Sequence, residues 1–354
     1  MTSSPCHPPA LRASLRGRTL ALTLAGQRAR REPYAGERQV SMIGRRDVLK
    51  LVGTAICTSA VGPALAGEAK KPRWKTAIGL NGYQSASAKY GKTFPIREVL
   101  QFASRTGFDG VELVPNWPPP TTDYPAPDDA GGIRAVRRLY EGFGLQVFSI
   151  QTWAAGAYDP DPAVRKKWLE GWRRQARFAK AVGAECIGLW PGGPLGKQTE
   201  AQAVDHLAES FREVWKLAGE LGLTASFEIE PPFVFRTEEH IRQILAKVPG
   251  ARTNLDFSHF DMFSGGRGRI AEVVKRIGVK NIGYVHLTDC DGTLRDGGTS
   301  KHLPCGDGHI DVAATLAVLR EGGFEGWIMI DAWEVPDPYE ANLKGKQAID
   351  RARA

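Results

Sequence analysis

The chain has 354 residues, of which 42% are hydrophobic and 24% are charged, a composition typical of a soluble globular protein. The formal net charge is +8, but residues 1–50 contain ten basic and three acidic residues and so carry +7 of it. The remaining chain is nearly neutral and offers no broad basic surface for nucleic acid. The length suits one large α/β barrel or two ordinary domains.

The basic N-terminal segment ends in a pattern that resembles a twin-arginine export signal. Residues 44–50 read Gly-Arg-Arg-Asp-Val-Leu-Lys, and the uncharged stretch after them ends at Ala64-Leu65-Ala66. A membrane anchor is the alternative, but this stretch is too short and too polar to span a bilayer comfortably. We therefore expect residues 42–66 to be a signal peptide for the twin-arginine translocation machinery. The mature protein would then be periplasmic or exported, without a stable membrane anchor. Residues 1–41 are expected to be disordered or to lie upstream of a true start at Met42.

From residue 67 to residue 354 the sequence alternates apolar β-type runs with amphipathic helical stretches. The predicted strands are Thr76–Leu80, Gly110–Val114, Gln146–Gln151, Glu185–Trp190, Thr224–Glu230, Thr253–Phe257, Ile282–Leu287 and Trp327–Asp331. The predicted helices are Pro95–Arg105, Ile133–Gly142, Ala163–Val182, Ala201–Leu221, Glu238–Lys247, Arg269–Ile277 and Val312–Glu321. This alternation predicts an α/β fold, a (β/α)8 TIM barrel. A doubly wound sheet is the alternative, but no G-x-G-x-x-G follows the first strand.

Three cysteines remain after the expected leader, Cys186, Cys290 and Cys305, and no C-x-x-C pair is present. An oxidising compartment would permit a Cys290–Cys305 disulfide. Free thiols are the favoured interpretation.

The active site of such a barrel lies at the carboxyl ends of the strands, so residues there are the candidates for chemistry. In chain order they are Glu112, Gln151, Trp153, Trp190, Glu228, Glu230, Asp256, His259, His286 and Asp331, with Glu334 just beyond. Buried carboxylates and imidazoles are costly unless they are paired or bind a cation. Glu228 and Glu230, Asp256, His286 and Asp331 lie at the ends of four consecutive strands, and together they predict a divalent metal site. Such a mixed oxygen and nitrogen set suits Mn²⁺, Mg²⁺ or Co²⁺, and Zn²⁺ is possible.

Each of these residues also has a purely structural interpretation. A single buried His is more often a hydrogen-bonded core residue, and a single strand-end Asp often caps the next helix. Glu112 could pair with a basic residue inside the barrel. The side chains of Trp117, Trp153 and Trp190 could stack on a sugar or simply pack under loops. The metal interpretation is favoured because the carboxylates and the imidazole occur together on consecutive strands.

Six short motifs follow one another along the chain. They are GFDGVEL at 107–113, GLTASFE at 222–228, LDFSH at 255–259, VHLTD at 285–289, LPCGDGHID at 303–311 and GWIMID at 326–331. Each is loose by itself, but in this order and spacing they resemble the sugar-phosphate isomerase/epimerase family with the xylose-isomerase-like barrel. The resemblance covers about Lys75 to Asn342.

The resemblance implies that Glu228, Asp256, His286 and a strand-8 carboxylate ligate one metal ion, with Mn²⁺ as the expected ion. Glu228 is chosen over Glu230 because the family's strand-5 Glu lies six residues after the Gly that starts the strand. On strand 8 the family usually has Glu where this chain has Asp331, so Glu334 is the reserve candidate.

The resemblance also bears on the substrate side of the site. His259 matches a family His that lies near substrate and metal, and His302 stands where sugar epimerases often carry Arg. We expect substrate contacts from His259, His302, Glu112, Trp153, Trp190 and Glu230.

The function implied is a sugar isomerase or epimerase that moves a proton through an enediolate, with Glu228 and Asp331 as base and acid. An exported enzyme meets few sugar phosphates, so an unphosphorylated sugar or keto-sugar is the expected substrate. The same chemistry with a leaving group at the β-carbon gives a lyase or dehydratase acting on a 3-keto glycoside or an inosose. An abasic-site endonuclease and a non-catalytic sugar-binding barrel are further alternatives. The near-neutral domain argues against the nuclease.

Overall fold

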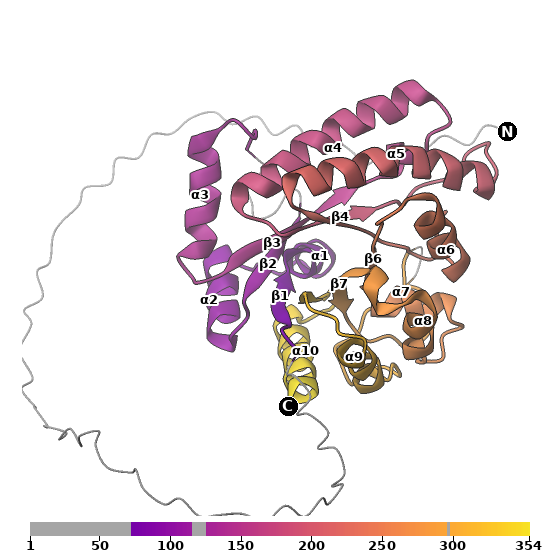
Figure 1. Ribbon diagram of the computed structural model, residues 1–354. Helices are drawn as coiled ribbons and strands as arrows, with labels where there is room; N and C mark the ends of the chain where they lie inside the picture. The colour runs from indigo at the N-terminus through magenta and orange to yellow at the C-terminus, as the bar shows by residue number, and fades with distance from the viewer. Residues whose placement is uncertain (1–71, 115–124, 296–297) are drawn as a thin grey trace, which may run out of the picture. The chain divides into compact units, whose positions relative to one another are not determined.

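A computed structural model describes residues 72–114, 125–295 and 298–354 (Figure 1). Eight parallel strands close into a barrel in chain order, and β8 pairs with β1. The strands are β1 Lys75–Gly79, β2 Gly110–Leu113, β3 Gln146–Trp153, β4 Cys186–Trp190, β5 Thr224–Phe227, β6 Thr253–Asp256, β7 Ile282–Leu287 and β8 Trp327–Ile330. This confirms the predicted (β/α)8 barrel and excludes the doubly wound sheet. The expected leader at 1–66 and Trp117 lie outside the described residues.

Most of the helices surround the strands on the outside of the barrel (Figure 1). Seven of them match predicted helices to within a few residues: α2 Ile96–Thr106, α3 Ala130–Glu141, α4 Pro162–Val182, α5 Glu200–Leu221, α6 Glu238–Lys247, α8 Ile270–Ile277 and α9 Val312–Glu321. The others, which the sequence pattern did not predict, are α1 Leu80–Tyr90, α7 Phe257–Phe263 and α10 Pro338–Arg353, with short 3₁₀ turns at Ala155–Tyr158 and Val279–Asn281.

Local sequence determines where the long helices begin and end. Helix α5 starts with a capping box in which Thr199 and Gln202 satisfy each other's backbone N–H groups. Helices α4 and α5 both end at glycines in the left-handed conformation, Gly183 with φ 90° and Gly222 with φ 66°. These stops return the chain to the next strand at the amino end of the barrel, so every strand points its carboxyl end towards the same face.

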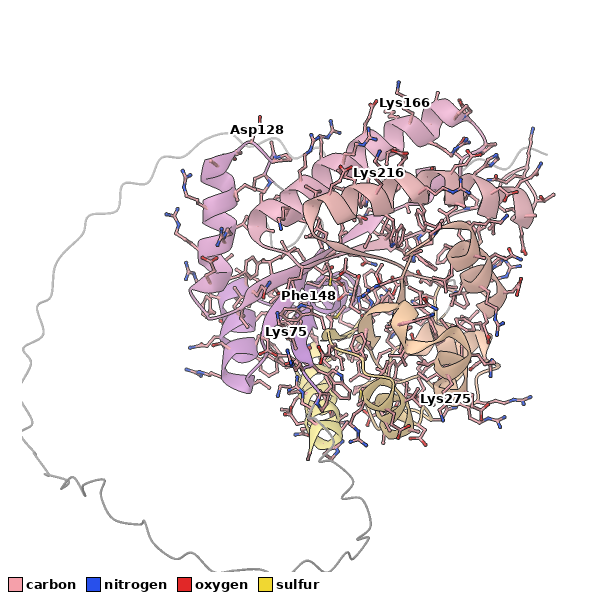
Figure 2. All side chains as sticks on the ribbon, viewed as in Figure 1. Lys75, Asp128, Phe148, Lys166, Lys216 and Lys275 are labelled. Atoms are coloured by element: carbon pink, nitrogen blue, oxygen red, sulfur yellow. The ribbon has the colours of Figure 1, made fainter. Side chains whose placement is uncertain are left out.

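Away from the carboxyl ends of the strands, the barrel interior is packed with large side chains, among them Phe148, Tyr284, Trp327 and Met329. The rings of Phe148 and Trp327 stack with their centroids 4.6 Å apart. Figure 2 shows Phe148 inside the barrel, whereas the labelled lysines of α4, α5 and α8 lie outside and are exposed. The barrel is therefore a filled core rather than a pore, and only its carboxyl end can admit a ligand.

Two smaller expectations concern the cysteines and the membrane. Cys186, Cys290 and Cys305 are free, so the favoured interpretation holds and the Cys290–Cys305 disulfide is not formed. None of the described helices is long and apolar enough to cross a membrane.

Candidate metal centre

The alternation of strand side chains brings four predicted metal ligands to the carboxyl end of the barrel. On β8, Trp327 and Met329 lie in the interior core, and the next residue on the same face is Asp331. Glu228 directly follows β5, Asp256 ends β6, and His286 lies near the end of β7. All four side chains are buried, with at most 6% of the residue surface exposed. Ionisable groups removed this completely from water require a partner charge or an ion.

The imidazole of His286 is the centre of this cluster. Its Nδ1 lies 3.1 Å from Glu228 Oε1, 3.4 Å from Asp331 Oδ2 and 3.9 Å from Asp256 Oδ2. Its Nε2 lies 3.1 Å from Glu112 Oε2 on the other side of the ring. One nitrogen thus faces three carboxylates from three strands, and the other is held by a fourth carboxylate. A metal-bound histidine has this arrangement when its second nitrogen donates to a carboxylate.

Two of the carboxylates are held in place by neutral donors. Gln151 Nε2 donates to Glu228 Oε2 over 2.9 Å, and Asn254 Nδ2 donates to Glu228 Oε1 over 3.1 Å. Asp331 Oδ1 accepts from Asn81 Nδ2 at 3.0 Å and from the backbone N–H of Trp333 at 2.9 Å. These bonds leave Asp331 Oδ2 directed at His286, so the shorter side chain still reaches the cluster.

The two carboxylate oxygens of Asp256 have different surroundings: one caps a helix, and the other faces the cluster. Its Oδ1 accepts from the backbone N–H of His259 at 2.9 Å, which caps α7, and from Ser258 Oγ at 2.7 Å. Its Oδ2 is buried and has no hydrogen-bond partner among the described residues. A buried carboxylate oxygen without a donor is costly. The orphaned oxygen, the converging acceptors and the single imidazole therefore fit a divalent cation.

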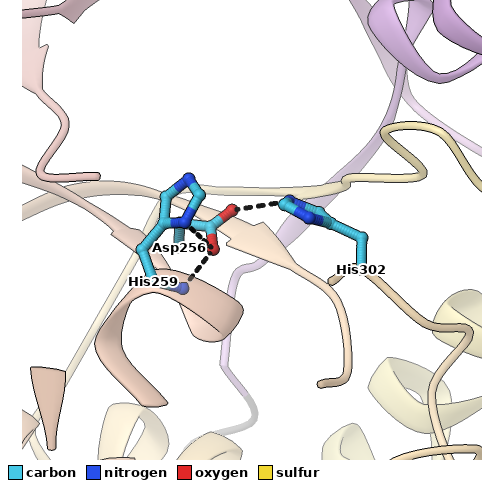
Figure 3. Close-up of side chains that lie close together, drawn as sticks. All are labelled: Asp256, His259 and His302. Carbon is cyan, nitrogen blue, oxygen red and sulfur yellow. Dashed lines mark hydrogen bonds and ion pairs between the residues drawn. The ribbon is translucent and has the colours of Figure 1, made fainter. Parts of the chain in front are cut away.

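Two more histidines flank Asp256, as Figure 3 shows. His302 Nε2 lies 3.7 Å from Asp256 Oδ2, and His259 Nδ1 lies 3.8 Å from Asp256 Oδ1. Ser300 orients both rings: its Oγ is 2.7 Å from His259 Nδ1, and its backbone oxygen is 2.9 Å from His302 Nδ1. Two groups among the described residues have ligand atoms within 4.8 Å of one another, Glu228–Asp256–His286 and Asp256–His259–His302.

The electrostatics show how strongly the carboxylates favour positive charge. Burial alone would lower the pKa of His286, but the charges of Glu112 and Glu228 hold that pKa well above its ordinary value. Burial likewise opposes protonation of His302, yet Asp256 and Asp331 raise its pKa to about 9. Burial lowers the pKa of His259 to about 4. Where protons are bound this firmly, a divalent cation can take their place.

A cavity of about 360 Å³ opens above the cluster. Its lining includes the predicted residues Trp153, Trp190, Glu228, Glu230, His259, His286, His302 and Asp331. Trp153 and Trp190 meet edge to face at 4.7 Å, and Phe233 meets Trp190 at 5.1 Å, which makes one side aromatic. Burial raises the pKa of Glu230, on the cavity wall, to about 8. The cavity therefore offers stacking surface and hydrogen-bonding groups, the combination that suits a sugar.

Some residues of the cavity were not predicted, and one predicted substrate contact does not line it. Asn81, Gln84, Phe233, Arg295, Thr299 and Trp333 line the cavity without having been candidates. Most of them lie in loops or on the unpredicted helix α1, where strand patterns give no signal. Glu112 lies against His286 and is not among the lining residues, so its position differs from that of a substrate contact.

Glu334, the reserve candidate, belongs to the rim of the cavity. Its carboxylate pairs with Lys89 at 2.5 Å and with Arg295 at 3.6 Å. Its backbone has a φ of 52°, the one positive value among described non-glycine residues. Because its carboxylate is occupied by two basic side chains, Glu334 is poorly placed to replace Asp331.

The family model of the xylose isomerase-like TIM barrel matches residues 100–351. The chain belongs to this family.

The chain is similar to proteins that include a dehydratase and an epimerase. An inosose dehydratase of Clostridium botulinum (strain Alaska E43 / Type E3) is 25% identical over 286 residues, which cover 73% of this chain and 90% of the relative. A solved structure of L-ribulose 3-epimerase has a TM-score of 0.60 at 18% identity and covers 79% of this chain and 96% of its own. A structure of the IOLI protein with a binding zinc atom has a TM-score of 0.61 at 17% identity and covers 78% of this chain and 96% of its own. At these identities the solved structures support the fold of the family alone.

Proposed function

We propose that this member of the xylose isomerase-like family is a divalent-metal-dependent isomerase or epimerase of an unphosphorylated sugar or keto-sugar. The observation that carries the proposal is that His286 Nδ1 faces three buried carboxylates from three different strands. Glu228, Asp256, His286 and Asp331 would hold the ion. The cavity above them, with its aromatic side, would hold the sugar.

The cation would polarise the substrate's carbonyl and adjacent hydroxyl oxygens and so make the neighbouring C–H group acidic. Glu228 and Asp331 are the proposed proton carriers. Glu228 Oε1 faces His286, so Oε2, which Gln151 holds, is the oxygen that would take the proton. Asp331 would act from the β8 side, with Oδ2 directed at the cluster and Oδ1 bonded to Asn81 and to the backbone N–H of Trp333. Two carboxylates on different strands allow a proton to leave one face of the substrate and return to the other.

Glu112 has a different proposed role from the predicted one. It would hold the Nε2–H of His286, so that Nδ1 keeps its lone pair for the ion. His259, His302, Glu230, Trp153 and Trp190 remain the proposed contacts of the substrate, and all five line the cavity.

A lyase is the second candidate, and the inosose dehydratase relative favours it. Removal of the same α-proton leads to loss of water when a hydroxyl group sits on the β-carbon and can leave with a proton. The metal-loaded protein should be incubated separately with a keto-inositol and with ketohexoses, and the products followed by NMR. An epimer indicates the first function and an unsaturated or diketo product the second. If no substrate of either kind changes, a sugar-binding barrel is favoured over an enzyme.

The metal centre can be tested without any substrate. Elemental analysis of the Asp256→Ala and His286→Ala proteins should show clear loss of the ion, and Asp331→Ala should weaken binding whereas Glu334→Ala should not. Full stoichiometry at wild-type affinity in both Asp256→Ala and His286→Ala would place the ion elsewhere.

A further inference from the structure

His302 stands where the family resemblance leads one to expect an arginine, and its surroundings are those of a ligand. Its Nδ1 lies 2.9 Å from the backbone oxygen of Ser300. A carbonyl oxygen can only accept, so Nδ1 carries the proton and Nε2 of the neutral ring has a free lone pair. The ring is buried, with 3% of the residue exposed, and cannot turn to water.

No donor with a free proton faces that lone pair in the described structure. Its neighbours are Asp256 Oδ2 at 3.7 Å, Asp331 Oδ2 at 4.0 Å and Ser258 Oγ at 3.4 Å. The hydroxyl of Ser258 already donates to Asp256 Oδ1. A lone pair and two carboxylates that face one another repel unless a proton or a metal cation lies between them, and a divalent cation can take the place of the proton.

The contacts of His302 and those of His286 together connect four ligand atoms into a ring. Asp256 Oδ2 and Asp331 Oδ2 alternate with His286 Nδ1 and His302 Nε2, and the four successive distances are 3.9, 3.7, 4.0 and 3.4 Å. All four are longer than hydrogen bonds of about 2.7–3.2 Å. The centre of such a ring lies about 2.3–2.7 Å from each atom, so a contraction of a few tenths of an ångström reaches ordinary metal–ligand bonds of about 2.0–2.2 Å.

We propose that His302 is itself a ligand of the metal ion rather than the substrate contact named above, and that it lies opposite His286 in the ring that the two histidines form with Asp256 and Asp331. This inference rests on the metal centre of the proposed function. An arginine cannot ligate a cation, so the ligand set of this chain has one imidazole more than the resemblance implies. A second imidazole shifts preference away from Mg²⁺ and Mn²⁺ towards Co²⁺ and Zn²⁺. His259 is not a member of the ring, since its Nδ1 bonds to Ser300 Oγ and its Nε2 lies 4.0 Å from Glu228 Oε1.

The test compares affinities of the metal-free full chain for Co²⁺ and for Mg²⁺ in wild type, His302→Ala, His286→Ala and His206→Ala. His206 lies on α5 and contacts Gln198, so it is the matched control. Loss of an oriented second-shell partner alone costs about 10- to 100-fold in metal affinity, so His302→Ala should weaken Co²⁺ by about 100-fold or more. It should weaken Mg²⁺ much less and alter the visible Co²⁺ spectrum. A merely structural role would weaken both ions by the same factor.

A second measurement does not depend on any variant. X-ray absorption of the wild-type Zn²⁺ form should count two imidazoles around the ion. One imidazole, or a His302→Ala protein with wild-type Co²⁺ affinity and spectrum while His286→Ala has lost the ion, overturns the role of His302 and leaves the proposed function standing. If His286→Ala also keeps the ion, the metal centre of the proposed function is wrong, and the inference falls with it.

Discussion

The ring of His286 lies between Glu112 on one side and the three carboxylates of the metal centre on the other. Glu112 Oε2 accepts from Nε2 of the ring, while Glu112 Oε1 is buried and has no hydrogen-bond partner in the described part of the chain. The carboxylate of Glu112 fixes both the tautomer and the orientation of the His286 imidazole. At this scale the centre depends on a residue that touches neither the ion nor the cavity.

Replacing Glu112 with Gln should therefore weaken metal binding by about 10- to 100-fold, because a neutral amide makes the imidazole a poorer donor of its lone pair. Metal affinity is measured by competition with a chelator, and KM is measured at saturating metal, where it should hardly change. The matched control is Glu185→Gln, since Glu185 binds Lys75 and Trp327 at the opposite end of the barrel. If Glu112→Gln instead raises KM and leaves metal affinity normal, the original prediction that Glu112 contacts the substrate is favoured.

At the scale of elements, the loop between β7 and α9 owes its shape to Asp289. Its two oxygens accept four backbone N–H groups, from Cys290 and Ile310 on Oδ1 and from Gly306 and Gly308 on Oδ2. In the sequence Asp289 is a carboxylate just after the strand that holds His286. The structure shows that it organises the loop that carries His302.

Asp289→Asn should lower the free energy of unfolding by about 2–4 kcal/mol, because the amide NH₂ group would face two backbone donors and leave them unpaired. Urea unfolding of the metal-free protein measures this without the added effect of ion binding. Asp291→Asn is the control: Asp291 is partly exposed and pairs with Lys301, so the change should be small. Equal losses in the two variants would show that Asp289 has no special role.

The sequence predicted the strands and amphipathic helices well, and it failed where the pattern is short or polar. Helix α7 has seven residues and starts inside the predicted strand Thr253–Phe257. Helix α1 buries small or polar residues such as Gly82 and Ser85, which have no apolar period. Strand β5 ends at Phe227, three residues before the predicted Glu230. Tertiary packing determines these elements and their ends, and local sequence preferences do not predict them.

For the site, strand alternation was enough to group Glu228, Asp256, His286 and Asp331 at one end of the barrel. It could not reveal contacts between loops. Ser258 and Ser300 lie 42 positions apart, yet their hydroxyl groups are 2.7 Å from each other. Through such contacts the site is completed by residues whose sequence neighbourhood shows no pattern.

At the scale of the whole molecule, the expected export signal remains a prediction, because residues 1–71 lie outside the described structure. Replacing Arg45 and Arg46 with Lys should abolish translocation of a folded reporter fused after Gly67. Delivery is measured by cell fractionation, with Arg30→Lys and Arg31→Lys as the control pair upstream of Met42. Periplasmic delivery that continues unchanged would rule out the twin-arginine interpretation.

The central claim is that the carboxyl end of the barrel removes a proton from the carbon next to a substrate carbonyl. Turnover of a keto-sugar or keto-inositol in D₂O measures this directly, since deuterium should appear at that carbon. Glu228→Gln should abolish the exchange, because an amide cannot act as the base. The loss of activity should appear in kcat far more than in KM. The comparison is made at metal concentrations where the variant is shown to be loaded. Exchange that persists in loaded Glu228→Gln, or wild-type turnover without deuterium at that carbon, would contradict the account.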